Sequence, residues 1–372
     1  MKVAIIVDWL VIYAGAERVL EQMIACYPDA DIFAVVDFMP QGERDFIHNK
    51  KVKTTFIQKL PFAKTKYRSY LPLMPLAIEQ LDLAGYDLIL SSSHAVAKGV
   101  ITGPGQTHIS YVHSPMRYAW DLQQQYLQES NSTKGPKSWL MRYLLHKLRL
   151  WDFASAARVD HFISSSNYIA QRINKAYRRK ATVIHPPVAV EKCQLLEEKE
   201  EFYVTAARLV PFKRVPLIAE AFSKMPNKKL VILGDGPELE KTKAFNTHGN
   251  IEFLGFQNHD VVVDYLQRAK AFLYAANDDF GILPVEAQAC GTPVIAFNQG
   301  GVLETIRGLD AEKPTGVFYE SQTANGLIEA IDAFEQTSIS PKDCRENSLR
   351  FSEDVFKNTL KKFVSNKREK TT

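Results

Sequence analysis

The sequence has few of the features that mark secreted, metal-binding or membrane-spanning proteins. Its four cysteines, at positions 26, 193, 290 and 344, lie far apart and form no CxxC pair. This spacing argues against a disulfide framework or a zinc site and is typical of a reducing compartment. No apolar run reaches the roughly 18 residues that a membrane span needs. The first residues, Met1–Asp8, are typical of a strand that ends in a charge, not of a signal peptide, so we expect a cytoplasmic protein, at most peripheral to a membrane.

An excess of positive charge is also missing. The chain has 46 basic and 42 acidic residues, a net charge of +4, which argues against nucleic acid as the main partner. Its 372 residues correspond to about two domains, and 46% hydrophobic residues provide an ample core.

Alternating strands and helices fill the first half of the chain. We expect an N-terminal domain over residues 1–185, with helices over residues 16–27, 137–157 and 167–178. Its expected strands are Val3–Val7, Ile32–Val36, Asp87–Leu90, His108–Val112, Val159–Ile163 and Thr182–Ile184. Such alternation predicts an α/β domain whose parallel sheet is covered on both faces.

A second α/β domain is expected over residues 186–351, after a linker that begins His185-Pro186-Pro187. Its expected strands are Phe202–Ala206, Leu230–Leu233, Ile251–Leu254, Ala271–Tyr274, Val294–Phe297 and Gly316–Phe318. Residues 352–372 form an amphipathic tail that we expect to pack back on the N-terminal domain, with Val355, Phe356, Leu360 and Phe363 on one side. Open α/β sheets bind ligands at the carboxyl ends of their strands, so both domains should present loops to a shared cleft.

The segment 275–293 is the most informative part of the chain. It follows a buried strand, turns at Phe280-Gly281, and enters a helix with Pro284 in its first turn. The N-terminus of that helix favours an anion, and two acidic residues, Asp278 and Glu286, flank the turn. A ligand with phosphate at one end and hydroxyls at the other, such as a nucleotide sugar, fits this pattern.

Two cations and a glycine turn follow earlier strands of the same domain. Arg208 and Lys213 lie between a strand and a helix, where they can clamp a diphosphate and stabilise it as it leaves; a solvated basic loop is the alternative. Gly234 and Gly236 form a turn that can approach a nucleotide. Leu239 occupies the third glycine position of G-x-G-x-x-G, so we reject a dinucleotide-dependent oxidoreductase.

Four motifs in this order resemble the retaining glycosyltransferases of family 4, which have the GT-B fold of two Rossmann-like domains. The motifs are Arg208 with Lys213, residues 234–237 (GDGP), residues 253–256 (FLGF) and residues 278–287 (DDFGILPVEA). The resemblance covers nearly the whole chain and is strongest from Tyr203 to Ile306.

The resemblance implies roles for the residues of the donor half. Glu286 matches the glutamate that binds the ribose hydroxyls, and Arg208 and Lys213 match the pair on the diphosphate. Asp278 matches a glutamate that contacts the sugar; it is one methylene shorter, so Asp279 is an alternative for that contact. The backbone N–H groups of Phe280, Gly281, Ile282 and Leu283 would hold the sugar and the distal phosphate.

In the first half, residues 14–18 resemble the glycine loop of the family, with Ala14 in place of the first glycine and Gly15 retained. We expect Gly15 to let the backbone approach the phosphate or acceptor, and Glu17 to be a helix-terminal charge rather than a catalyst. His113 matches a histidine that faces the sugar. Residues 91–99 should line the acceptor side. The aromatic side chains of Tyr118 and Trp120 either stack on sugar or belong to the core.

Three further patterns receive a structural or surface interpretation. Residues 164–167 (SSSN) are interpreted as a helix cap. Asp29 and Asp31 form a D-x-D pattern that we do not interpret as a metal site, and the family implies that no metal or other cofactor is required. Residues 56–76 and 137–149 mix lysine and arginine with apolar residues, which suits an anionic membrane surface; helices packed on the sheet are the alternative.

We therefore predict a retaining hexosyltransferase that uses a nucleoside-diphosphate sugar and a glycan acceptor, which we expect to be lipid-linked. The Asp-Phe-Gly variant and residues 113–118 (HSPMRY) resemble bacterial mannosyltransferases of O-antigen and exopolysaccharide assembly, which favours GDP-mannose and leaves UDP-hexosamines open. The alternatives are a GT-B nucleotide-sugar epimerase or hydrolase, and a non-catalytic subunit that binds sugar nucleotides.

Overall fold

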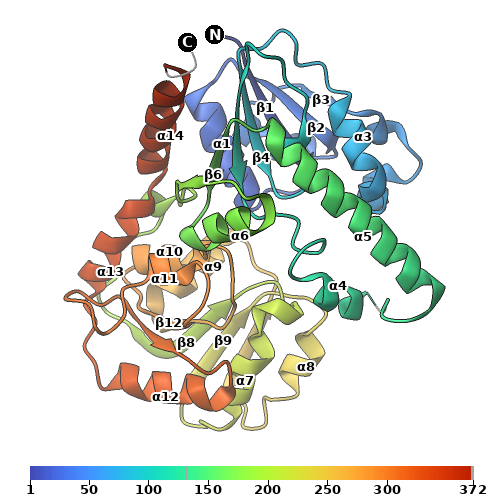
Figure 1. The fold of residues 1–372 in the computed structure, drawn as a ribbon. Helices are drawn as coiled ribbons and strands as arrows, with labels where there is room; N and C mark the ends of the chain where they lie inside the picture. The colour runs from blue at the N-terminus through green and yellow to red at the C-terminus, as the bar shows by residue number, and fades with distance from the viewer. Residues whose placement is uncertain (131, 370–372) are drawn as a thin grey trace. The chain divides into compact units, whose positions relative to one another are not determined.

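The chain forms two compact units in a computed structural model that describes residues 1–130 and 132–369 (Figure 1). Unit 1 contains Met1–Pro186 and the chain from Phe356 onward, and unit 2 contains Pro187–Val355. Each unit is built on one parallel sheet with helices on both faces, so the predicted α/β fold of two Rossmann-like domains is confirmed.

The sheet of unit 1 has seven parallel strands in the order β3-β2-β1-β4-β5-β6-β7. They are β1 (Val3–Leu10), β2 (Asp31–Asp37), β3 (Val52–Thr54), β4 (Leu88–Ser93), β5 (Thr107–Val112), β6 (His161–Ser164) and β7 (Ala181–Val183). The six strands that the sequence predicts are present. The edge strand β3 was not predicted, because three residues with an exposed lysine at the centre carry no periodic signal.

Helices cover both faces of this sheet. They are α1 (Gly15–Cys26), α2 (Ala63–Lys66), α3 (Met74–Glu79), α4 (Gln123–Glu129), α5 (Gly135–Ser155), α6 (Asn167–Tyr177) and α14 (Glu353–Arg368). One core joins α1 and α14 to the sheet through Met23, Ile24, Phe356 and Leu360. Val355 was expected on the buried side of α14, but it is 45% exposed, and Val364 is buried in its place.

The sheet of unit 2 has six parallel strands in the order β10-β9-β8-β11-β12-β13. They are β8 (Glu200–Ala206), β9 (Lys229–Leu233), β10 (Ile251–Gly255), β11 (Ala269–Tyr274), β12 (Val294–Phe297) and β13 (Gly316–Tyr319). The helices are α7 (Val215–Ser223), α8 (Leu239–Lys243), α9 (His259–Arg268), α10 (Ile282–Ala289), α11 (Val302–Thr305), α12 (Ala324–Glu335) and α13 (Pro341–Ser348). All six strands agree with the prediction.

Strand order reverses once in each sheet, and this reversal locates the ligand side of each unit. In unit 1 it falls between β1 and β4, and in unit 2 between β8 and β11. Connections leave these neighbouring strands toward opposite faces, so a crevice opens at their carboxyl ends. The loops after these four strands are therefore the first place to look for a site.

None of the helices in the described residues is long and apolar enough to cross a membrane.

Candidate active site

The loop after β11 carries Asp278, whose carboxylate is held by two side chains. Lys213 forms an ion pair with it, and the hydroxyl of Tyr274 donates a hydrogen bond to the same oxygen at 2.8 Å. Lys213 and Asp278 are 65 residues apart in sequence and were predicted separately, and the structure brings them together. The ion pair fixes the position of the Lys213 ammonium and offsets part of its charge.

Arg208 follows β8, the neighbour of β11. Its side chain is exposed and forms no hydrogen bond or ion pair with another residue in the described parts of the chain. Arg208 therefore keeps its full charge at the switch point of the sheet, while Lys213 shares its charge with a carboxylate. Of the two predicted cations, Arg208 is the one that pairs with no carboxylate of the described residues.

The glycine turn after β9 supports the Arg208 loop. A Cβ atom on Gly234 would lie 1.8 Å from the carbonyl oxygen of Ala207, and one on Gly236 would lie 2.5 Å from that of Leu209. Both glycines also have positive φ, at +133° and +153°. Two backbone hydrogen bonds complete the contact: Leu209 N–H donates to Asp235 at 2.8 Å, and Glu238 N–H donates to Leu209 at 3.0 Å. The space in front of these glycines is thus occupied by the loop that carries Arg208.

The segment from Asp279 to Leu283 turns the chain into α10. Gly281 has φ +87°, a left-handed conformation that favours glycine, and it is the residue before the helix. The ring of Phe280 is buried and packs 5.4 Å from the ring of Phe351, so this side chain anchors the turn. Ile282 and Leu283 are half-buried in the first turn of α10, where backbone N–H groups lack helical partners.

A second glycine pair, Gly300 and Gly301, packs against the backbone of this loop and was missed by the sequence analysis. Gly301 N–H donates to the carbonyl oxygen of Asp278 at 2.8 Å. A Cβ atom on Gly300 would lie 2.5 Å from that oxygen, and one on Gly301 would lie 2.2 Å from the carbonyl oxygen of Asp279. The signal available in the sequence was the Gly-Gly pair that follows a predicted strand after two intervening residues.

Glu286 lies on the second turn of α10 and is 1% exposed. The imidazole Nε2 of His259, the first residue of α9, lies 3.4 Å from its Oε1. His259 is 40% exposed, so it stands between the buried carboxylate and solvent. The sequence analysis missed His259, because a single histidine at the start of a short helix has no distinguishing pattern.

In unit 1, Asp8 on β1 organises the loop after β4. Its buried carboxylate accepts hydrogen bonds from four consecutive backbone N–H groups, those of residues 94–97, at 2.6–3.0 Å. The His94 ring nitrogen Nδ1 lies 3.0 Å from the same carboxylate. Sequence analysis noted Asp8 only as a charge that ends a strand. Since the residues lie 86 or more positions apart, only the pairing of β1 with β4 brings them together.

His113 follows β5 and is held by a neighbouring strand. Its Nε2 lies 2.8 Å from the hydroxyl of Ser92 on β4. Burial, together with the nearby ring of His94, lowers the pKa of His113 to about 3. The imidazole is therefore neutral at physiological pH and can exchange hydrogen bonds with hydroxyl groups, but it carries no proton for general-acid catalysis.

Gly15 is the first residue of α1, and Glu17 in the same turn closes the helix end by accepting a hydrogen bond from Ala14 N–H at 3.0 Å. This contact places Glu17 at the helix end, where the sequence analysis expected a helix-terminal charge. Burial is the largest cause that raises the pKa of Glu17 to about 7, and the nearby Asp8 carboxylate adds to the shift.

Several other predicted residues have structural roles. The Trp120 indole donates to the buried Asp152 at 2.8 Å, so Trp120 belongs to the interior of unit 1, and Tyr118 packs against the same core. Ser166 caps α6, as predicted, by accepting from Ile169 N–H at 3.1 Å. Asp31 forms an ion pair with Lys53 at 3.2 Å. In the described residues no group of three His, Cys, Asp or Glu side chains is arranged to hold a metal ion.

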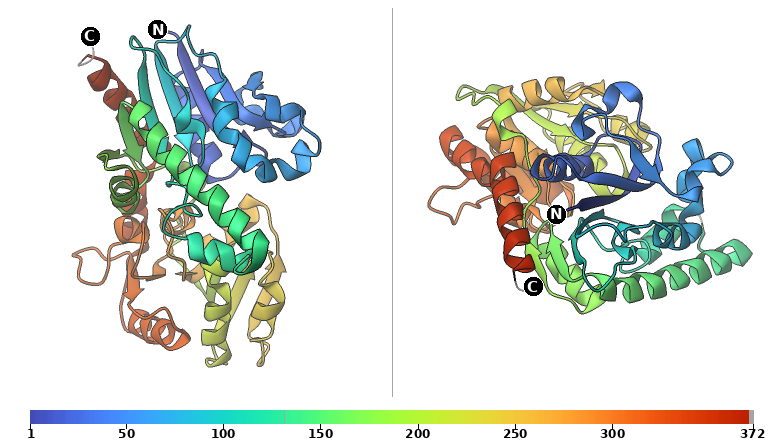
Figure 2. Two further views of the ribbon diagram at one scale, coloured as in Figure 1. Left: turned by 45° about the vertical axis from the view of Figure 1, so that its right-hand side comes forward. Right: turned by 90° about the horizontal axis from the view of Figure 1, so that it is seen from above.

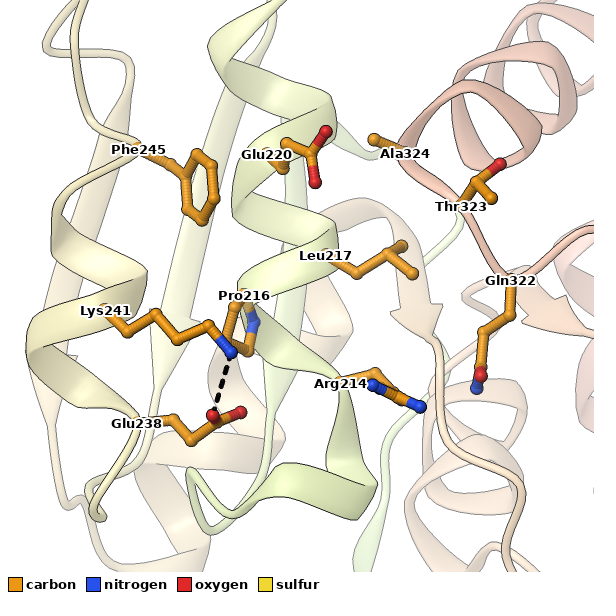
Figure 3. Close-up of a pocket in the computed structure, with 10 residues that line it drawn as sticks. All are labelled: Arg214, Pro216, Leu217, Glu220, Glu238, Lys241, Phe245, Gln322, Thr323 and Ala324. Atoms are coloured by element: carbon orange, nitrogen blue, oxygen red, sulfur yellow. Dashed lines mark hydrogen bonds and ion pairs between the residues drawn. The ribbon is translucent and has the colours of Figure 1, made fainter.

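A separate pocket of about 360 Å³ lies on unit 2 over α7, α8 and the start of α12 (Figure 3). Its walls include Arg214, Leu217, Lys241 and Phe245, and none of the predicted site residues lines it. Figure 3 shows the Lys241–Glu238 ion pair at one side and Arg214 beside Gln322 at the other. We do not assign this pocket to the candidate active site.

Two family models match the chain and together span residues 13–351. Residues 13–192 match glycosyltransferase family 4, and residues 190–351 match glycosyl transferases group 1. Together with the two Rossmann-like units, these matches show that the chain belongs to the glycosyltransferases with the GT-B fold.

Particular relatives agree with this class. The chain is 26% identical over 317 residues to an uncharacterized glycosyltransferase of Methanocaldococcus jannaschii, which covers 83% of each protein. It is 28% identical over 204 residues to a GDP-mannose-dependent phosphatidylinositol monomannoside mannosyltransferase of Corynebacterium glutamicum, covering 46% of this chain and 52% of the relative. The structure of Anabaena HepE in complex with UDP superposes with a TM-score of 0.68 at 16% identity, over 98% of this chain and 100% of HepE.

Proposed function

We propose that this glycosyltransferase is a retaining hexosyltransferase that uses a nucleoside-diphosphate sugar. The observation that carries the proposal is the arrangement at the β8/β11 switch point, where the exposed Arg208 follows β8 and the Lys213–Asp278 ion pair forms in the loop that leads from β11 to α10. Cations and backbone N–H groups near one switch point suit a diphosphate leaving group, whose negative charge grows as the glycosidic bond breaks.

In this proposal, different residues of unit 2 bind different parts of the donor. Arg208 and Lys213 bind the diphosphate, and the N–H groups of residues 280–283 bind the distal phosphate and the sugar. Asp278 or Asp279 accepts hydrogen bonds from sugar hydroxyls, and Glu286 accepts them from the ribose. Gly234 and Gly236 contribute by holding the Arg208 loop in place. The side-chain cations supply the positive charge at the leaving group, and we assign no metal or other cofactor to the reaction.

Retention of configuration follows in this proposal from attack on the same face that the diphosphate leaves. The leaving phosphate oxygen takes the proton of the acceptor hydroxyl, so no enzyme nucleophile is required. His113, as a neutral imidazole, would exchange hydrogen bonds with the sugar, and Gly15 would let the backbone of unit 1 approach the acceptor. The reaction then needs no side chain that changes its protonation state.

GDP-mannose is the donor that we favour, and a lipid-linked glycan of bacterial surface polysaccharide or O-antigen is the acceptor. Similarity to a GDP-mannose-dependent mannosyltransferase supports this donor. The HepE complex contains UDP, so UDP sugars are the competing donors. An acceptor with a lipid anchor would place the enzyme at the inner face of the cytoplasmic membrane.

The test is a thermal-shift screen with GDP, UDP and ADP sugars, followed by NMR of the product that forms with the stabilising donor. We expect a new glycosidic bond with the anomeric configuration of the donor, and loss of this product for Arg208→Ala. An inverted product would overturn the retaining assignment. Conversion of the donor without any acceptor would indicate an epimerase or hydrolase, and tight binding without turnover would indicate a non-catalytic subunit.

A further inference from the structure

The long helix α5 of unit 1 exposes large apolar side chains that do not contribute to the core. Trp139, Leu140 and Tyr143 are 78%, 58% and 50% exposed, and with Pro136 they line a groove of about 470 Å³. The helix packs through its other side, where Leu145 and Leu148 are buried in the core that also contains α3. The outward residues are therefore not needed to hold α5 in place.

The segment that carries this apolar surface is positively charged. Residues 132–151 contain five lysine or arginine residues and no aspartate or glutamate. Lys137 and Lys147 are exposed beside the three apolar side chains, and the ammonium of Lys147 lies 5.5 Å from the centre of the Tyr143 ring. We call Lys137, Trp139, Leu140, Tyr143 and Lys147 the α5 surface.

A second segment of the same kind packs against the same core of unit 1. Residues 50–78 contain seven lysine or arginine residues and no acidic residue, and Phe62 is 75% exposed there. The indole of Trp151 on α5 donates to Glu79 at the end of α3 at 2.9 Å, which ties the two segments together. Figures 1 and 2 show α3 and α5 on the same side of the unit 1 sheet.

The composition of the α5 surface indicates which kind of partner binds it. A polypeptide partner would have to supply carboxylates that pair with the lysines. A second copy of this segment has no acidic residue and therefore cannot supply them. An anionic bilayer can bind both the basic and the apolar side chains of the α5 surface, because its phosphates attract lysines while its headgroup region accepts tryptophan and tyrosine rings. One exposed helix face then contributes both the apolar and the electrostatic attraction.

We propose that α5 docks the protein on an anionic phospholipid surface, with Trp139, Leu140 and Tyr143 entering the headgroup region and Lys137 and Lys147 contacting phosphates. This inference rests on the proposed lipid-linked acceptor, since docking would bring the enzyme to its substrate. Lipid binding and sugar transfer are nevertheless separate measurements, so each proposal can fail without the other.

The test is co-sedimentation of the full chain with vesicles of phosphatidylcholine alone or with 30% phosphatidylglycerol. We expect binding to the anionic vesicles only, and release in high salt because screening weakens the attraction. Each lysine near such a surface contributes about fivefold to the partition coefficient, so Lys137→Ala with Lys147→Ala should lower it about 25-fold. The Trp139→Ser, Leu140→Ser, Tyr143→Ser variant should lose binding as well.

Phe256 of unit 2 is 82% exposed, and Phe256→Ser is the matched control, which should sediment like the unaltered protein. Because the altered side chains are exposed, each variant should keep the thermal unfolding midpoint of the unaltered protein. Each should also still transfer sugar to a short soluble acceptor. The proposal is overturned if the unaltered protein ignores anionic vesicles, or if the α5 variants bind as well as Phe256→Ser does. It is also overturned if the α5 variants instead abolish a dimer seen in sedimentation velocity.

Discussion

Replacing Arg208 by alanine separates the chemistry of the site from the stability of the fold. The side chain is exposed and has no hydrogen-bonding or ionic partner in the described residues, so its loss should change the free energy of unfolding by less than about 0.5 kcal/mol. Its proposed contact forms with a diphosphate whose charge develops in the transition state. Removing one such contact typically lowers kcat about 10²–10³-fold, which corresponds to about 2.7–4 kcal/mol.

The assay is initial-rate transfer from the preferred donor, together with urea unfolding of the same samples. Arg208→Lys keeps the charge but loses the planar fork of donors, so it should fall between alanine and the unaltered enzyme. Arg214→Ala is the matched control, since Arg214 is an exposed arginine six residues away whose side chain lines the separate pocket in Figure 3. If Arg208→Ala transfers sugar at the unaltered rate, the assignment of this residue to the diphosphate is wrong.

Three other changes test the loops and the buried acids. Asp8→Asn should lower the free energy of unfolding in urea by about 3 kcal/mol, because a carboxylate that accepts from four backbone N–H groups is replaced by an amide with one acceptor oxygen; an unchanged urea midpoint would contradict this role. Gly301→Ala should lower kcat/KM about 100-fold with an unchanged circular dichroism spectrum, because its Cβ would lie 2.2 Å from the carbonyl oxygen of Asp279 and displace the donor loop; normal kinetics would show that the loop tolerates the shift. Glu17 holds its proton to about pH 7 in the folded protein and to about 4.5 when unfolded, so the stability from the protonated form is complete below pH 4.5 and is lost as the pH rises through 7. Unfolding of Glu17→Gln at a series of pH values should therefore show the variant gaining stability relative to the unaltered protein between pH 4.5 and 7, and parallel curves would argue against the raised pKa.

The central strands of both sheets were predictable because they are buried on both faces and contain runs of apolar residues. Segments such as Val3–Val7 and Ala271–Tyr274 need no distant information to be recognised. The three-residue strand β3 lies at the sheet edge, where a short pairing with β2 decides its conformation. Tertiary context, rather than local sequence, produced that element.

The candidate site was predictable in its residue types but not in its contacts. Lys213 and Asp278 stood out because each follows a strand near a helix start. Their ion pair depends on the pairing of β8 with β11, which no local pattern encodes. The same reason explains why Asp8 was underestimated and why His259 was missed, since both act on segments far along the chain.

The last helix of the chain completes the core of the unit that begins it. Phe356, Leu360 and Val364 of α14 share one core with Met23 and Ile24 of α1. In the sequence, the 169 residues of unit 2 lie between these two helices. During synthesis, the apolar face of α1 that shares a core with α14 therefore stays uncovered by that helix until the ribosome has also produced unit 2 and α14. A nascent chain stalled before α14 would expose this face to chaperones and to other chains.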